Sequence, residues 1–198
     1  MRMMLRVSLA AAMAMSLGGC ALLGGGPKPP PWLLTLTPSA PAPTSVVRSA
    51  NAGEAVTIDV PVIPKELRSV RVPAQVGETA IAYIKDLQWV DTPDHLFQDL
   101  LQETVLRTTN RVVIDPKQST LDPGLVVTGQ LLSFGYEAGQ GTVLVRYDAA
   151  LSAAGGTRVE TRRFEARAPA DGTAATVGPA LNTAANQVAN DVAKWIGG

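Results

Sequence analysis

The sequence predicts an α+β fold, a two-layer sandwich in which a mostly antiparallel sheet carries two amphipathic helices on one face. The sheet is indicated by three consecutive strand-like runs at residues 125–138, 141–155 and 157–169, which are separated by glycine-containing turns. The helices are indicated by apolar residues that recur with a helical period in residues 93–109 and 175–198.

Upstream of the first helix, the sequence favours extended structure. Residues 32–38 form a short apolar and β-branched run, which predicts a first strand. Residues 55–64 alternate in polarity and predict a second strand, while Pro61 and Pro64 place it at a sheet edge or near its own end. The apolar face of this strand is expected to hold Val56, Ile58, Val60 and Val62.

Three more extended segments are predicted on either side of the first helix. Residues 69–75 form one of them, and residues 79–84 form the next. Residues 86–91 are then expected to lead the chain towards the helix. After the helix, residues 111–116 have the composition of a further strand, which a proline terminates.

The first helix is predicted to begin at Pro93, because proline is favoured at the first helical position. Asp91 or Thr92 is expected to cap it. Its apolar stripe consists of Leu96, Phe97, Leu100, Leu101 and Val105.

The three long runs after residue 125 predict an antiparallel meander. The third run is polar on one face, so we expect that face of the sheet to meet solvent. The last helix is expected to end at Gly197. Its apolar face consists of Val177, Leu181, Ala184, Val188, Val192 and Trp195.

Residues 1–19 have the layout of a secretory signal peptide. Arg2 and Arg6 supply positive charge, and the run from Val7 to Leu17 contains no charged residue. This run is about half as long as the ~20 residues that a membrane-spanning helix needs, so it does not predict a transmembrane anchor.

The single cysteine, Cys20, follows this run directly. Leu17-Gly18-Gly19-Cys20 resembles the lipobox of bacterial lipoproteins, which implies cleavage between Gly19 and Cys20 and a diacylglyceryl and acyl lipid on Cys20. A lone cysteine cannot build a disulfide framework in a secreted chain. The alternatives are an ordinary signal peptide with a chance cysteine and a cysteine that is buried in the core.

The residue after the cysteine is Ala21 and not aspartate. In the enterobacterial sorting scheme, this resemblance points to the inner leaflet of the outer membrane, facing the periplasm. Residues 20–31 are then the lipidated cysteine and a tether rich in glycine and proline. Residues 32–198 are long enough for a single periplasmic domain with its own core.

Composition excludes one class of partner. Lys and Arg together number 17, as do Asp and Glu, and removal of Arg2 and Arg6 with the signal peptide leaves 15 basic against 17 acidic residues. The basic residues are not clustered. The sequence therefore lacks the electrostatic footprint of a nucleic-acid-binding protein.

The sequence contains no motif for nucleophilic catalysis, phosphate binding, dinucleotide binding or metal binding. The only histidine, His95, lies near Asp91 and Asp94 at the expected helix start. A general base or metal ligand there is disfavoured against a polar residue in a first helical turn. We therefore expect no enzyme, no metal site and no cofactor beyond the covalent lipid.

Trp32, Trp89 and His95 are the candidates for side chains that face a partner. Trp32 directly follows the tether, where it would face the membrane, face a partner or cap the first strand. For Trp89 and Trp195, a place in the core is favoured over a surface that binds a ligand or partner.

Three segments of the chain form a recognisable series: Trp32–Pro38, Val60–Leu67 and Trp89–Leu101. Their order and spacing resemble those of the ABC-type transport auxiliary lipoprotein family, the PqiC-like lipoproteins. Members begin with a lipobox and a strand of the form Tyr/Trp-x-Leu-x-Pro, and a tryptophan precedes their leucine-rich helix. The chain departs from the family pattern at Glu66–Ser69 and at Val90–Pro93.

This resemblance implies a non-enzymatic component of an MCE-type lipid transport system, which docks the transporter at the outer membrane. It implies an MCE-domain periplasmic protein as the partner, contact with the membrane through the lipid anchor, and a homo-oligomer. The alternative is a structural or assembly lipoprotein of another envelope complex, such as lipopolysaccharide export or a Tol-like system.

Overall fold

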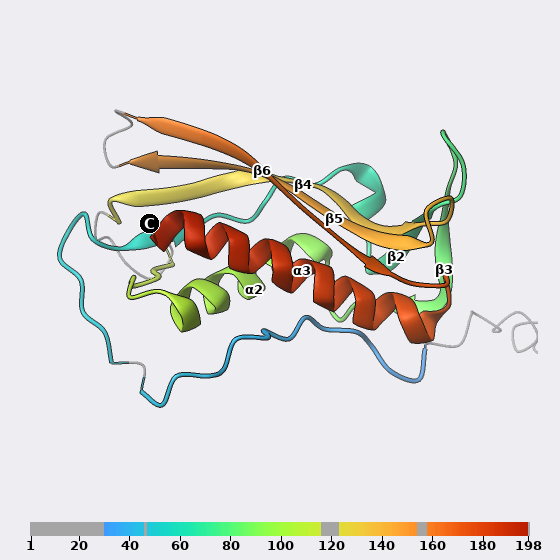
Figure 1. Cartoon of the computed structure of the whole chain (residues 1–198), viewed down its shortest axis with the longest axis horizontal. Helices are drawn as coiled ribbons and strands as arrows, with labels where there is room; N and C mark the ends of the chain where they lie inside the picture. The colour runs from blue at the N-terminus through green and yellow to red at the C-terminus, as the bar shows by residue number, and fades with distance from the viewer. Residues whose placement is uncertain (1–29, 46, 116–122, 154–157, 198) are drawn as a thin grey trace, which may run out of the picture. The chain divides into compact units, whose positions relative to one another are not determined.

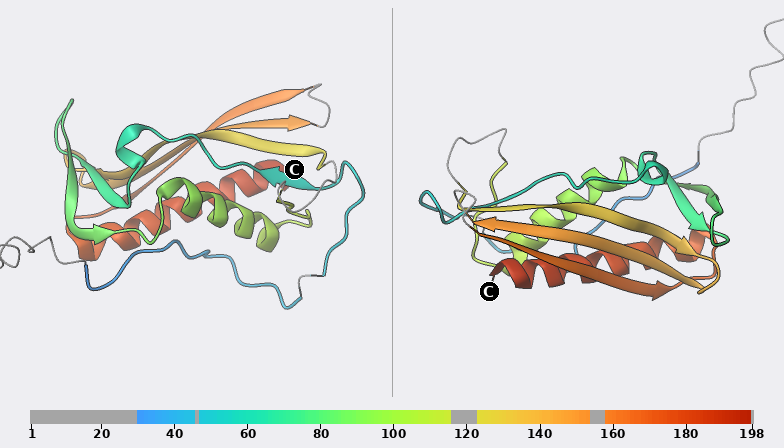
Figure 2. Two further views of the ribbon diagram at one scale, coloured as in Figure 1. Left: turned by 180° about the vertical axis from the view of Figure 1, so that it is seen from behind. Right: turned by 90° about the horizontal axis from the view of Figure 1, so that it is seen from above.

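The computed structural model describes residues 30–45, 47–115, 123–153 and 158–197 (Figure 1). From Trp32 onward they belong to one compact unit. It contains a six-stranded mixed sheet with two helices packed against one face, which confirms the predicted α+β fold. Figure 2 shows from above how α3 runs along the length of the sheet.

The strands are β1 (Val56–Ile58), β2 (Arg71–Gln75), β3 (Ile81–Gln88), β4 (Leu125–Glu137), β5 (Thr142–Ala153) and β6 (Val159–Pro169). The helices are η1 (Lys65–Leu67, a 3-10 turn), α2 (Pro93–Thr108) and α3 (Ala174–Gly197). The sheet order is β3-β2-β4-β5-β6, and β1 pairs with β4 outside this path. The strands β4, β5 and β6 form the predicted antiparallel meander, while β1 and β2 run parallel to β4.

Helix α2 begins where the sequence predicted it. Pro93 occupies the first turn, and Thr92 before it has extended backbone angles but makes no capping hydrogen bond through its side chain. Instead the Asp91 carboxylate accepts a 2.7 Å hydrogen bond from the Thr92 N–H. The expected apolar stripe faces the core: Leu96, Phe97, Leu100, Leu101 and Val105 are all buried.

The start of helix α3 is organised by an aspartate that the sequence pattern did not single out. The Asp171 Oδ1 accepts hydrogen bonds from the Thr173 N–H (2.9 Å), from the Thr173 hydroxyl (2.7 Å) and from the Thr176 hydroxyl. These hydrogen bonds lower the pKa of Asp171 to about 2, because they stabilise its ionised form. The helix therefore has a charged N-terminal anchor, which also complements the positive end of its dipole.

Replacement of Asp171 with asparagine should remove part of the acid sensitivity of the fold. A carboxylate whose pKa is lowered on folding stabilises the folded state above the unfolded pKa, and this contribution disappears as the pH falls through the folded pKa. For Asp171 the window runs from about pH 4, near the unfolded value, to about pH 2. Urea unfolding between pH 2 and pH 5 is expected to show a shallower loss of stability in Asp171→Asn than in the parent. Equal pH dependence would contradict this role.

The core between sheet and helices is built around aromatic rings. Phe97 of α2 lies edge-on to Tyr147 of β5, with 5.2 Å between ring centroids, and Trp89 lies 5.4 Å from Phe134 of β4. Tyr147 is fully buried, and its hydroxyl donates to the Thr128 carbonyl at 3.3 Å. Burial is the main cause that raises the pKa of Tyr147.

The other face of the meander is polar, as predicted, and carries crossed ion pairs. The Arg146–Glu165 and Arg163–Asp148 pairs bridge the two strands β5 and β6 at 2.7 and 2.6 Å. These residues stand directly opposite each other in the antiparallel register. Each pair is partly exposed, so it contributes little to the free energy of folding. Together the two pairs place positive and negative side chains next to each other on this face of the sheet.

Several predicted strands are shorter than expected or absent. Residues 32–38 and 111–115 each contribute only an isolated parallel bridge, Leu34 with Trp89 and Val113 with Val56; residue 116 lies outside the described residues. The strand expected at 55–64 is limited to β1 and an isolated parallel bridge between Val62 and Gln130. Its predicted apolar face is only half correct, because Val56 and Ile58 are buried whereas Val60 and Val62 are exposed.

Strand β3 is longer than predicted. The chain was expected to leave the sheet at residue 86, but β3 continues to Gln88. It does so through a bulge opposite β2, where the pairing jumps from Pro73–Tyr83 to Arg71–Gln88. Asp86 within the bulge has a positive φ of 57°. The residues of β3 between Tyr83 and Gln88 outnumber those of β2 opposite them, and this bulge lets β3 resume its pairing with β2 at Gln88.

Candidate functional site

The predicted lipidation site lies outside the described residues. Cys20, Gly19 and the tether as far as residue 29 belong to the part of the chain that the structure does not describe. Signal cleavage and lipid attachment therefore stay predictions from the sequence. Among the described residues, no helix is both long enough and apolar enough to cross a bilayer.

Trp89 belongs to the core, which is the place that the sequence favoured for it, so it is not a partner-facing side chain. Its side chain is 1% exposed, and its backbone N–H donates to the Val70 carbonyl at 2.7 Å. Trp89 is buried because β3 continues as far as Gln88, the residue before it, and this places the Trp89 ring in the core against Phe134. Trp195 is half-buried, and its indole N–H donates to the Glu160 carboxylate at 2.8 Å.

Trp32 and His95, the other two candidates, are exposed. The Trp32 side chain is 49% exposed at the start of the described domain. The His95 Nδ1 lies 3.4 Å from the Asp91 carboxylate, and both side chains are more than half exposed. The pKa of Asp91 is lowered, first by the hydrogen bond from the Thr92 backbone and then by His95. An exposed pair of this kind is typical of a helix start.

The described residues contain no group of three or more His, Cys, Asp or Glu side chains that could hold a metal ion. Several charged side chains of the described chain form ion pairs, such as Arg107 with Glu103 on α2 and Lys194 with Asp191 on α3. The geometry therefore directs attention to surfaces that contact other molecules.

One such feature is an extended segment, residues 34–40, that lies across the helix layer; we call it the strap. Its backbone is held by α3, because the Asn182 Oδ1 accepts from the Thr37 N–H at 2.8 Å and the Asn186 Oδ1 accepts from the Ser39 N–H at 2.6 Å. The Asn186 amide also donates to the Thr37 carbonyl at 2.9 Å. In Figure 1 the blue segment follows the helices along their outer side.

Sequence reasoning did not single out Asn182 or Asn186 and missed the strap. Asn186 is 5% exposed and therefore buried. The available signal was the spacing, because Asn182, Asn186 and Asn190 recur every four residues on a helix. Asparagine is a poor helix former, so a repeated asparagine on one face indicates a hydrogen-bonding role.

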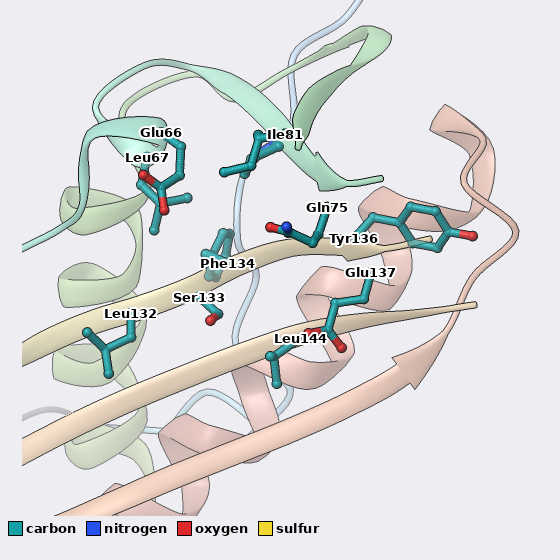
Figure 3. Close-up of a pocket in the computed structure, with 12 residues that line it drawn as sticks. Glu66, Leu67, Gln75, Ile81, Leu132, Ser133, Phe134, Tyr136, Glu137 and Leu144 are labelled. Carbon is teal, nitrogen blue, oxygen red and sulfur yellow. The ribbon is translucent and has the colours of Figure 1, made fainter. Parts of the chain in front are cut away.

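The second surface feature is a hollow of about 80 Å³ beside β2, which we call the β2 hollow (Figure 3). Leu67 of η1 and Ile81 of β3 approach it from one side, and Leu132 and Leu144 approach it from the sheet. Polar side chains surround this apolar centre, namely those of Glu66, Gln75, Ser133, Tyr136 and Glu137.

The size of the β2 hollow limits what it can bind. Pockets for small molecules usually measure about 300–1,000 Å³, and the β2 hollow, at about 80 Å³, lies well below that range. A small aliphatic side chain fits this space, and an apolar centre with a polar rim is the usual anatomy of a protein–protein contact.

Three wider grooves measure about 650, 540 and 920 Å³. The first and the last are lined mainly by polar and charged side chains, whereas the second has a mixed lining in which Leu36, Pro38, Leu100, Leu106 and Val113 are apolar. The groove of about 920 Å³ is lined by four basic side chains, those of Arg48, Arg107, Arg111 and Lys194. Arg107 pairs with Glu103 on α2, and Lys194 pairs with Asp191 on α3. Arg111 donates to the Ile196 carbonyl at 3.0 Å and so caps the end of α3. The polar linings of the first and last grooves do not suit an acyl chain.

Comparison with known proteins gives two kinds of match. The protein family described as ABC-type transport auxiliary lipoprotein component matches residues 34–193. No curated protein is significantly similar in sequence.

Among solved structures, a crystal structure from Xanthomonas campestris, assigned to the family DUF330, superposes with a TM-score of 0.66 at 16% identity. It covers 85% of this chain and 92% of its own. A second crystal structure, of an uncharacterized protein, has a TM-score of 0.59 at 14% identity and covers 76% and 96% of the two chains. These two structures share the fold.

Proposed function

Since the chain belongs to the family of ABC-type transport auxiliary lipoprotein components, we propose that it serves an MCE-type intermembrane lipid transport system. In this proposal it is a lipid-anchored, non-enzymatic subunit that docks the transporter at the periplasmic face of the outer membrane. The observation that carries the proposal is the extent of the family match, which runs from the strap to α3 and includes every strand.

The surfaces of the described domain support a role in protein contact. The β2 hollow is too small for a lipid chain, and two of the three wider grooves present mainly polar and charged linings. A subunit that docks another protein needs an apolar centre with a polar rim and no enclosed ligand cavity. The β2 hollow, with Ile81 exposed beside it, is the surface that we assign to the MCE-domain partner.

The edge position of β3 favours this assignment. β3 is the terminal strand of the sheet order, and its side chains from Ile81 to Lys85 are exposed or half-buried. A terminal strand presents unpaired backbone groups that a partner's strand can use. The small apolar hollow beside that edge would then receive one aliphatic side chain of the partner as an anchor.

Anchoring and partner contact can be tested together. We expect the native protein, solubilised from membranes in mild detergent, to co-purify with an MCE-domain protein that carries phospholipid. The Cys20→Ala variant should lose membrane association, because a thiol is required for the lipid, and should lose this co-purification. The measurement is mass spectrometry of the purified complex and of the membrane and soluble fractions.

The controls separate the two parts of the proposal. A serine variant at exposed Val159, on the far edge strand β6, should keep both anchoring and co-purification. If the anchored protein co-purifies instead with lipopolysaccharide-export or Tol-like components, the MCE assignment is wrong although the lipoprotein assignment stands. If Cys20→Ala remains in the membrane fraction, the anchor itself is wrong.

A further inference from the structure

Three exposed apolar residues lie next to the Leu34–Trp89 bridge, where the tether enters the domain, and we call them the patch. It consists of Trp32, Leu33 and Val90, whose side chains are 49, 50 and 56% exposed. Leu33 and Val90 directly flank the bridge between Leu34 and Trp89. Because Leu34 and Trp89 pack inward, the alternation of an extended chain turns Leu33 and Val90 outward. Trp32 lies one residue before Leu33 and is exposed at the start of the domain.

This entry point is fixed to the domain. The Leu34 N–H donates to the Gln88 carbonyl, and the Leu34 carbonyl accepts from the Val90 N–H, both at 2.8 Å. The Leu34 side chain also packs closely on Gly178 of α3, where an added Cβ would lie 2.8 Å from it. The strap continues this attachment through Asn182 and Asn186. The patch therefore stays where the chain leaves the domain.

The length of the tether brings the patch near the predicted lipid. Residues 21–31 separate Cys20 from Trp32, and an extended chain of that length spans at most about 40 Å at ~3.3 Å per residue. A short tether of this kind produces an effective concentration of order millimolar. A weak contact between the patch and the bilayer is then sufficient to orient the domain.

We propose that the patch of Trp32, Leu33 and Val90 rests on the headgroup–acyl boundary of the bilayer that holds the Cys20 lipid. An indole is favoured at this boundary because it combines an apolar body with a polar N–H. The titratable side chains next to the patch are Asp91, which follows Val90, and His95, which pairs with the Asp91 carboxylate. Because the three patch residues themselves carry no charge, the proposed contact with the bilayer is apolar and not electrostatic. The inference rests on the proposed lipid anchor and does not depend on which transporter the protein serves.

The three tryptophans provide an internal control. We would label the full lipidated protein with 5-fluorotryptophan, confirm the lipid by mass spectrometry, and reconstitute it in phosphatidylethanolamine–phosphatidylcholine vesicles with spin-labelled lipid. The 19F resonance of Trp32 is expected to broaden. Those of Trp89, which is buried, and Trp195, which packs against Phe164, should remain sharp. Broadening should persist in high salt, because the contact is apolar.

Variants test whether the patch itself makes the contact. The double variant Leu33→Ser/Val90→Ser changes only exposed side chains and should leave thermal stability unchanged, but it should reduce the broadening of Trp32. The matched control is Val159→Ser, which changes a similarly exposed valine at the first residue of β6. This variant should leave the broadening of Trp32 unchanged.

Three results would overturn the proposal. In verified lipidated protein, a Trp32 resonance that stays sharp shows that the patch does not touch the bilayer. Unchanged broadening in the double variant shows that the tether alone brings Trp32 close. A Trp32 that is shielded only after an MCE-domain partner is added shows that a protein, and not the membrane, covers the patch. The first two results do not depend on whether the transporter assignment is correct.

Discussion

Replacement of Trp89 with alanine is expected to lower the free energy of unfolding by about 3–5 kcal/mol, the range for truncation of a large aromatic side chain in a core. The side chain is 1% exposed and packs on Phe134, which in turn lies 6.4 Å from Phe97 of α2. Its loss would leave a cavity between the end of β3 and the helix layer. Equilibrium unfolding in urea, with the slope of the transition compared, measures the effect.

The matched control is Trp32→Ala, the same chemical change at an exposed site. Because Trp32 is 49% exposed and lies outside the core, its truncation should change stability by no more than about 0.5 kcal/mol. If the two variants lose similar stability, the burial of Trp89 described above is incorrect. If Trp89→Ala proves too unstable to purify, Trp89→Phe should show a smaller loss in the same direction.

The second large effect is expected at Asn186. Its replacement with alanine removes the acceptor of the Ser39 N–H and the donor to the Thr37 carbonyl. Each polar group that loses its partner contributes about 1–3 kcal/mol when it stays buried, and water can reach part of the strap. We therefore expect a loss of about 1–3 kcal/mol. Urea unfolding gives this value, and hydrogen exchange at the Thr37 and Ser39 amides should become faster.

The neighbouring residue on α3 supplies the control. Gln187 is exposed and its amide donates to Asp191 on the same helix, so Gln187→Ala should change stability by less than about 0.5 kcal/mol and leave exchange in the strap unchanged. If Asn186→Ala leaves the exchange of Ser39 unaffected, the asparagine does not hold the strap.

Local patterns were sufficient to predict the fold class, the meander and both helices. The apolar stripe of α2 and the glycine-containing turns of residues 139–141 act within a few residues, so their consequences are visible in sequence. The polar face of β6 was predictable for the same reason. These features account for the two layers of the domain.

The failures have a common physical cause, which is long-range pairing. Residues 32–38 and 111–115 look like strands, but only single bridges to Trp89 and Val56 are available to them. A strand is stabilised by its neighbours in the sheet, and no local pattern specifies them. Trp89 was assigned an ambiguous role because its burial depends on the bulge in β3, which no periodicity reveals.

The candidate surfaces were the least predictable part. The β2 hollow gathers residues from η1, β2, β3, β4 and β5, and their proximity depends on the parallel pairing of β2 with β4. The patch at the tether entry was half predictable, since Trp32 follows the tether in sequence. Its companion Val90 joins it only through the bridge between Leu34 and Trp89.

If the protein acts by contact with an MCE-domain partner through the β2 hollow, site-specific photocrosslinking in intact cells should capture that partner at the hollow. A photoreactive amino acid would replace Ile81 at the hollow or, as the control, Val159 on the far edge strand; both side chains are exposed. The account predicts an adduct with an MCE-domain protein from position 81 and none from position 159. It would be contradicted by no such adduct from position 81, or by an adduct there with a lipopolysaccharide-export or Tol-like protein.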